Sequence, residues 1–179
     1  MDRELRKRLE TFLLPFYQDL DGASRFDEVE RIARIARKLH TPSGDDRPFE
    51  LLLLFHRLGA WLEKVGNLSR TLLGVPGLTE SDLRRTASSI RRLDAPVTDE
   101  ERAVAAAVLL DQAGIRGLAE LLGRARREGN SLMDVLRAAL SDVAVPEWLP
   151  PHAEEWLHKR RESRREVCRK LLAEIAMEE

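Results

Sequence analysis

The sequence predicts an all-α protein that folds as a single compact helical bundle. Apolar residues recur at helical spacing along most of the 179-residue chain, and the apolar–polar alternation of β-strands is almost absent. At four predicted helix starts a Ser or Thr is followed three positions later by an acidic residue, the pattern of a capped helix. Short segments rich in Pro, Gly and Asp separate the helices, and such connections favour antiparallel neighbours in one domain. We therefore expect residues 1–179 to form one domain.

The composition limits the classes of partner. Apolar residues make up 43% of the chain, and 30 basic against 31 acidic residues leave a net charge of −1, which indicates neither nucleic acid nor a membrane surface. The single cysteine, Cys168, excludes an intrachain disulfide and a cysteine-rich zinc module. No segment has the ~20 apolar residues that cross a bilayer, and the first residues lack the apolar stretch of a signal peptide. We expect a cytoplasmic protein with no membrane partner.

The first helix that the pattern defines covers residues 26–39. Val29, Ile32 and Ala36 recur at helical spacing and predict a buried face, while charged residues occupy the intervening positions. Ser24, followed by Asp27, supplies a side-chain oxygen for the first turn and an acid near the positive end of the helix dipole. These two residues predict where the helix begins.

Two apolar segments are predicted to form the centre of the core. Residues 51–55 are apolar on every side, which is typical of a helix in the middle of a bundle, and residues 103–110 have the same character with smaller side chains. His56-Arg57 follows the first segment and Asp111-Gln112 follows the second. These polar residues are therefore expected beside the core.

Further helix starts lie between and after these segments. Thr79 with Asp82 predicts a helix that begins near residue 80. Thr98 with Glu101 is a Thr-x-x-Glu capping box, which predicts the start of the helix that contains residues 103–110. Ser131, followed three residues later by an Asp, repeats the arrangement. The helical core is expected to cover about residues 24–140.

A closing loop and a basic amphipathic helix are predicted over about residues 146–176. Residues 158–170 contain seven Lys or Arg against two Glu, without the interleaved aromatic residues that stack on bases. Val167, Leu171 and Ile175 form an apolar stripe at helical spacing. The pattern favours a helix docked on the bundle over a nucleic-acid-binding surface.

The order of these motifs resembles that of the HD-domain metal-dependent phosphohydrolases. The resemblance covers about residues 24–175 and rests on four segments: Phe26-Asp-Glu-Val-Glu-Arg, Leu53-Leu-Phe-His-Arg-Leu-Gly, Val108-Leu-Leu-Asp-Gln-Ala-Gly, and residues 157–175, which resemble the closing helix of the family. In that family two His, an Asp adjacent to the second His, and a distant Asp hold a metal that activates water and neutralises phosphate oxygens. The resemblance implies an HD-like helical fold.

The metal-ligand pattern is degenerate in this chain. The resemblance places Glu28 at the first His and Arg57 at the paired Asp, while His56 and Asp111 match the family. A guanidinium has no lone pair for a metal and stays protonated at ordinary pH. We therefore expect a catalytically inactive binding or interaction module, with no catalytic residue, metal or cofactor.

Two other interpretations stay open. The chain could be a phosphohydrolase of nucleotides or other phosphate esters that holds Mn²⁺ or Mg²⁺ with Glu28, His56, Asp111 and a rearranged ligand. Alternatively, arginines near the former metal site could bind phosphate without hydrolysing it. These arginines are Arg57, Arg91, Arg92 and Arg116.

A purely structural interpretation of the same positions is an internal network of ion pairs that fills a vestigial metal site. The network would consist of Glu28, Arg57 and Asp111, with Arg116 as an additional candidate. The partner is expected to be a small phosphate-containing ligand or a protein, and the sequence does not indicate an oligomeric state.

Overall fold

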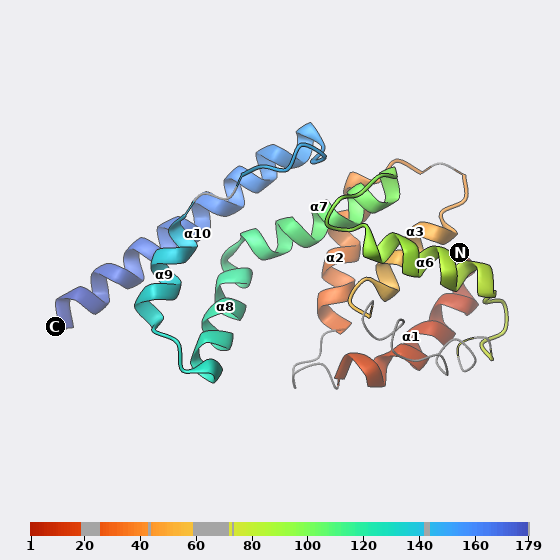
Figure 1. Ribbon diagram of the computed structural model, residues 1–179, viewed down its shortest axis with the longest axis horizontal. Helices are drawn as coiled ribbons and strands as arrows, with labels where there is room; N and C mark the ends of the chain where they lie inside the picture. The colour runs from red at the N-terminus through yellow and green to blue at the C-terminus, as the bar shows by residue number, and fades with distance from the viewer. Residues whose placement is uncertain (19–25, 43, 59–71, 73, 142–143, 179) are drawn as a thin grey trace. The chain divides into compact units, whose positions relative to one another are not determined.

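The computed structural model describes residues 1–18, 26–42, 44–58, 72, 74–141 and 144–178. These residues form eight α-helices and no β-strand, so the prediction of an all-α protein is confirmed (Figure 1). Contacts divide the chain into two compact units, Met1–Ala107 and Val108–Glu179. None of the described helices is both long and apolar enough to cross a membrane.

The described residues of the first unit form four helices and the beginning of a fifth: α1 (Arg3–Gln18), α2 (Phe26–Leu39), α3 (Arg47–Phe55), α6 (Glu80–Arg91) and α7 (Asp99–Ala113). Helix α3 packs against α2 and α6, and α1 packs against α2. All five residues from Leu51 to Phe55 are buried, as the unbroken apolar run predicts.

Helix α1 adds to the core of this unit although it precedes the predicted core limits of 24–140. Leu5, Leu9, Leu13 and Tyr17 recur every four residues and are all buried in one cluster with α3. Because i and i+4 lie on the same helix face, this spacing gives α1 a continuous apolar stripe. The helix is therefore part of the fold.

Helix α2 has the bounds that the pattern predicts, Phe26 to Leu39, and its predicted apolar face is buried. The proposed cap Ser24 lies outside the described residues. In α7, the residues from Ala103 to Ala107 are buried, while Val108 and Leu109 are half-buried. The small side chains of that segment therefore pack as the prediction requires.

The three predicted helix caps that lie among the described residues are present. Asp82 N donates to Thr79 Oγ1 at 3.2 Å and Thr79 N donates to Asp82 Oδ2 at 2.9 Å, a reciprocal capping box. The backbone nitrogens of Thr98 and Glu101 donate to each other's side chains at 3.3 Å. At the start of α9 (Leu132–Leu140), Ser131 is the N-cap and accepts from a backbone nitrogen at 3.4 Å.

The second unit contains the end of α7, then α8 (Ile115–Glu128), α9 and α10 (Pro151–Glu178). Helix α10 contacts both α8 and α9, which also contact each other, as Figure 1 shows. Their shared core consists of Leu118, Leu136, Ala139 and Cys168. The residues of the apolar stripe predicted at the end of the chain, Val167, Leu171 and Ile175, are partly buried and pack against this core.

Candidate functional site

An ion pair joins the two positions at which this chain departs from the HD-domain ligand pattern. Glu28 lies in the first turn of α2, and Arg57 follows His56, which is the C-cap of α3. Arg57 Nε donates to Glu28 Oε1 at 3.0 Å, and Arg57 Nη2 donates to the same oxygen. The Glu28 side chain is 8% exposed and that of Arg57 is 29% exposed, so the pair is largely withdrawn from water.

A buried tyrosine lies beside this pair. The Tyr17 hydroxyl donates to the Leu54 carbonyl at 2.6 Å, and the Tyr17 ring makes an edge contact with Phe26, with 6.0 Å between ring centroids. Burial raises the pKa of Tyr17 well above its ordinary value, and the negative charge of Glu28 raises it further, while Arg57 acts in the opposite direction. Tyr17 is therefore a protonated hydrogen-bond donor that ties α1 to the end of α3.

His56 is buried next to Arg57 in the chain. Its Nδ1 lies 2.8 Å from the Leu53 carbonyl oxygen. Because a carbonyl oxygen only accepts hydrogen bonds, the proton of a neutral His56 is on Nδ1 and the basic lone pair is on Nε2. The backbone thus fixes the ring orientation and the tautomer.

Asp111, the remaining position of the resembled pattern, belongs to the second unit and is buried near the end of α7. Glu28 and Arg57, by contrast, both belong to the first unit and are in contact there. Among the residues that the structure describes, no three His, Cys, Asp or Glu side chains form a group that could hold a metal ion.

Two of the other three candidate arginines have acidic partners of their own. Arg92, at the end of α6, donates through Nε to Glu101 Oε1 at 3.1 Å. Arg116 lies on the exposed side of α8, with its Nε 3.8 Å from Glu120 Oε1 in the next turn. Arg91 is an exposed residue of α6 that also makes contacts. Arg57 and Arg92 thus pair with acids of the first unit, and Arg116 pairs with an acid of its own helix in the second unit.

The pKa of Glu101 depends strongly on its surroundings. Its carboxylate is fully buried and also accepts from the backbone nitrogen of Val97 at 3.0 Å. Burial alone would raise the pKa of Glu101, but hydrogen bonds from Arg92, Val97, Ser89 and Thr98 outweigh it and lower the pKa to about 2. Glu101 is therefore ionised at neutral pH and locks the α6–α7 connection.

The sequence patterns do not identify Tyr17 or the Arg92–Glu101 pair as parts of these polar clusters. Tyr17 was detectable as the last member of the four-residue apolar repeat of α1. Glu101 was recognised only as a helix cap, because the capping pattern does not show which cation faces it.

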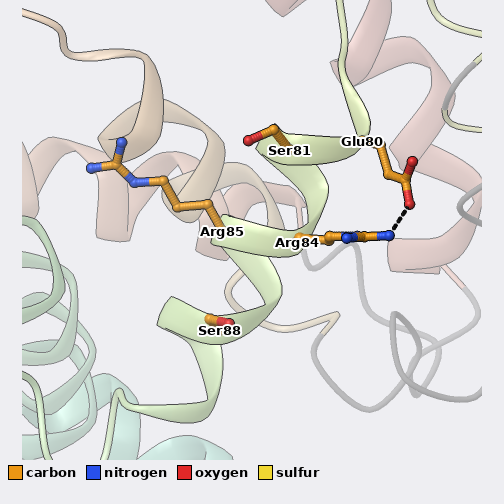
Figure 2. A pocket seen from close by; sticks show the side chains of 5 residues that line it. All are labelled: Glu80, Ser81, Arg84, Arg85 and Ser88. Carbon is orange, nitrogen blue, oxygen red and sulfur yellow. Dashed lines mark hydrogen bonds and ion pairs between the residues drawn. The ribbon is translucent and has the colours of Figure 1, made fainter.

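A shallow pocket on α6 lies apart from these residues. Glu80, Ser81, Arg84, Arg85 and Ser88 line it, all from one helix (Figure 2). Figure 2 shows Arg84 turned toward Glu80, with which it forms an ion pair, and Arg85 pointing away from them. The Arg84 side chain is 80% exposed, so water screens the pair and the pocket is an open helix surface.

Comparisons with models of known protein families and with characterised proteins find no match to this chain. The resemblance to HD-domain phosphohydrolases therefore stays a prediction that rests on the segments of sequence quoted for it.

Proposed function

We propose that this chain is an HD-like binding or interaction module without phosphohydrolase activity. The Glu28–Arg57 ion pair carries the proposal, because it joins the two residues that stand where the resembled enzymes have metal ligands. A cytoplasmic location belongs to the same proposal and is supported by the low cysteine content, one residue in the chain. The partner in this proposal is a protein or a small phosphate-containing molecule.

The charge of Arg57 argues against a divalent cation beside it. At ~4 Å and an effective dielectric constant of about 20, two unit charges repel by roughly 4 kcal/mol, and a dication doubles that value. Admitting the metal would also require Arg57 to leave Glu28, which would break the hydrogen bonds to Oε1. Both effects disfavour metal binding at Glu28.

The competing interpretation is a phosphohydrolase that holds Mn²⁺ or Mg²⁺ through Glu28, His56 and Asp111 with a further ligand. The Nδ1–H tautomer of His56 has its lone pair on Nε2, which is suited to a metal. That interpretation needs Arg57 to swing away from Glu28. A measurement of metal content therefore separates the two interpretations.

The test compares the natural chain with a variant in which the resembled ligands are rebuilt. After incubation with Mn²⁺ and desalting, we expect less than one tenth of an equivalent of metal on the natural chain and no hydrolysis of nucleotides or p-nitrophenyl phosphate. The double variant Glu28→His/Arg57→Asp should retain more Mn²⁺, and Glu28→His alone should not, because Arg57 is still present. One equivalent of metal on the natural chain, with phosphatase activity that His56→Ala abolishes, would overturn the proposal.

A phosphate-sensing pocket built on Arg57, Arg91, Arg92 and Arg116 is the third interpretation. The ion pairs of Arg57 with Glu28 and of Arg92 with Glu101 argue against it, since a ligand would have to compete with acids of the chain itself. Thermal-shift measurements with Arg92→Ala test it directly, because this variant should leave any stabilisation by phosphate compounds unchanged.

A further inference from the structure

Helix α10 has two arginines on its buried face. Arg161 is 6% exposed and lies between Leu157 and Cys168, which are both fully buried. Arg164 follows one turn later, is half-buried, and has its Nε shielded from water. Because residues three apart lie on the same side of a helix, the two guanidinium groups project from one face. Long basic side chains are rarely buried this far without an acidic partner.

Within the described part of the chain, neither arginine pairs with a carboxylate, and Arg164 Nε has no hydrogen-bond partner. Burial, and the positive charge of Arg164, lower the pKa of Arg161. The two cations therefore disfavour each other in a partly dry environment.

Three glutamates of α10 pair with cations of the same helix. Glu155 binds Lys159 at 2.6 Å, Glu166 binds Lys170 at 2.7 Å, and Glu162 lies within 3.4 Å of both Arg165 and Arg169. Apart from the half-buried Arg165, these side chains are exposed, and the partners of the three glutamates are not Arg161 and Arg164. An amphipathic helix that packs in the ordinary way turns its cations toward solvent and not toward the core.

A third arginine extends the same face. Arg160 is half-buried, and its Nη1 donates to the Leu110 carbonyl at 2.9 Å in the last turns of α7. It also passes Gly114, where an added Cβ would lie 3.8 Å from Arg160 Nη1. The bond to Leu110 fixes Arg160 at the junction of α7 and α8 while leaving most of its five N–H donors for other acceptors.

We propose that this arginine face of α10, formed by Arg160, Arg161 and Arg164, binds the phosphate group of a small molecule. Unpaired buried charges are unfavourable, and an anion that enters among them removes that cost. Guanidinium groups recognise phosphate through parallel N–H···O bonds, and a phosphate monoester carries about 1.5 to 2 negative charges at neutral pH, against one for a carboxylate. Two guanidiniums that have no carboxylate partner among the described residues therefore match phosphate better than a carboxylate.

This inference adds a ligand to the proposed binding role, but it concerns the second unit and does not use Glu28 or Arg57. Failure to find phosphate binding would overturn it and leave the proposal for Glu28 and Arg57 to be judged by metal content. Phosphatase activity would overturn the latter and leave the arginine face untouched.

Isothermal titration calorimetry of the full chain with inorganic phosphate, at constant ionic strength, tests the inference. We expect one equivalent to bind, and Arg161→Met to weaken binding at least tenfold. Arg169→Met is the matched control, because Arg169 is an exposed residue of the same helix paired with Glu162, and it should bind phosphate as the natural chain does. A second titration with ATP distinguishes the ligand source, since tighter binding than that of inorganic phosphate would indicate a phosphate ester.

Thermal unfolding without phosphate supplies a readout that a purely structural arginine would not give. Arg161→Met removes a buried charge and keeps the apolar stem, so its melting temperature should equal or exceed that of the natural chain. Phosphate should raise the melting temperature of the natural chain and not that of the variant. If Arg161→Met does not fold, Arg164→Gln takes its place in both measurements.

Three results would contradict the inference: no phosphate binding by the natural chain, equal binding by natural chain and variant, or a lower melting temperature of Arg161→Met with phosphate binding retained. The last result would mean that Arg161 serves only the packing of α10.

Discussion

Arg57 and Glu28 make the clearest prediction at the scale of a single residue. Arg57→Ala leaves the buried carboxylate of Glu28 without the cation that satisfies it, which should lower the free energy of unfolding by about 3 kcal/mol. For a chain of this size that corresponds to a fall of roughly 6–12 °C in melting temperature. Unfolding in urea, monitored by circular dichroism, measures the change in the free energy of unfolding.

Arg84→Ala is the matched control, because Arg84 also forms an ion pair with a glutamate but is 80% exposed. It should change the free energy of unfolding by less than about 0.5 kcal/mol. Equal effects of the two substitutions would mean that water reaches the Glu28–Arg57 pair freely.

Glu101 predicts how stability depends on pH. Its pKa is about 2 in the folded chain against an ordinary 4.5, so the unfolded state binds its proton first as the pH falls. The stabilisation is complete above pH 4.5 and is lost as the pH falls toward 2. Glu101→Gln should cost about 2 kcal/mol at pH 7, and the difference between natural chain and variant should shrink steadily below pH 4.5.

Unfolding in urea at several pH values measures this difference. Glu155→Gln serves as control, since Glu155 pairs with Lys159 on the exposed side of α10. A difference for Glu101→Gln that stays constant down to pH 3 would show that the carboxylate charge is not what stabilises the connection.

At the scale of elements, the turn between α7 and α8 depends on a glycine. An added Cβ at Gly117 would clash with the Gln112 carbonyl oxygen, and because that oxygen belongs to the backbone the turn itself would have to move. Gly117→Ala should therefore destabilise the chain by about 2–3 kcal/mol.

Gly123 offers the opposite case in the same helix. An added Cβ there would meet only the end of the Arg127 side chain, at 3.7 Å, which can move aside. Gly123→Ala should stabilise the chain by about 0.5–1 kcal/mol, because alanine loses less backbone entropy on folding. Urea unfolding of both variants should give effects of opposite sign, and the same sign for both would contradict the account of the turn.

The sequence predicted those elements whose signals are local. The bounds of α2 and the caps at Thr79, Thr98 and Ser131 follow from spacings of three or four residues, which one helical turn brings together. The Glu28–Arg57 pair joins residues 29 positions apart, so residue spacing alone could not show that they touch.

The resemblance drew attention to positions 28 and 57 because they depart from a ligand pattern, which placed both residues at one site. It could not show whether Arg57 turns to an acid of the chain or to a ligand, since that choice depends on side-chain geometry. Arg161 shows the limit most clearly: the sequence predicts that residues 158–170 belong to a docked helix, but the apolar stripe of Val167, Leu171 and Ile175 does not show that Arg161 is buried.

At the scale of the whole molecule, the two units have cores of different quality. In the first, every residue from Leu51 to Phe55 of α3 is buried. In the second, Leu136 and Ala139 are the residues of α9 that are buried, and the apolar residues around them, such as Leu122 and Leu171, are only partly buried. Opening a helix costs less when it exposes less apolar surface.

We therefore expect backbone amides of α9 to exchange with deuterium at least tenfold faster than those of α3 at neutral pH. Leu136→Ala removes the largest buried side chain of α9 and should accelerate exchange in α8, α9 and α10, because these helices share one core. Leu54→Ala should instead accelerate exchange in α1 and α3, whose side chains share the core of the first unit. Hydrogen-exchange mass spectrometry resolves the helices, and uniform acceleration by either substitution would show that the chain opens as one cooperative unit, since separate units would respond separately.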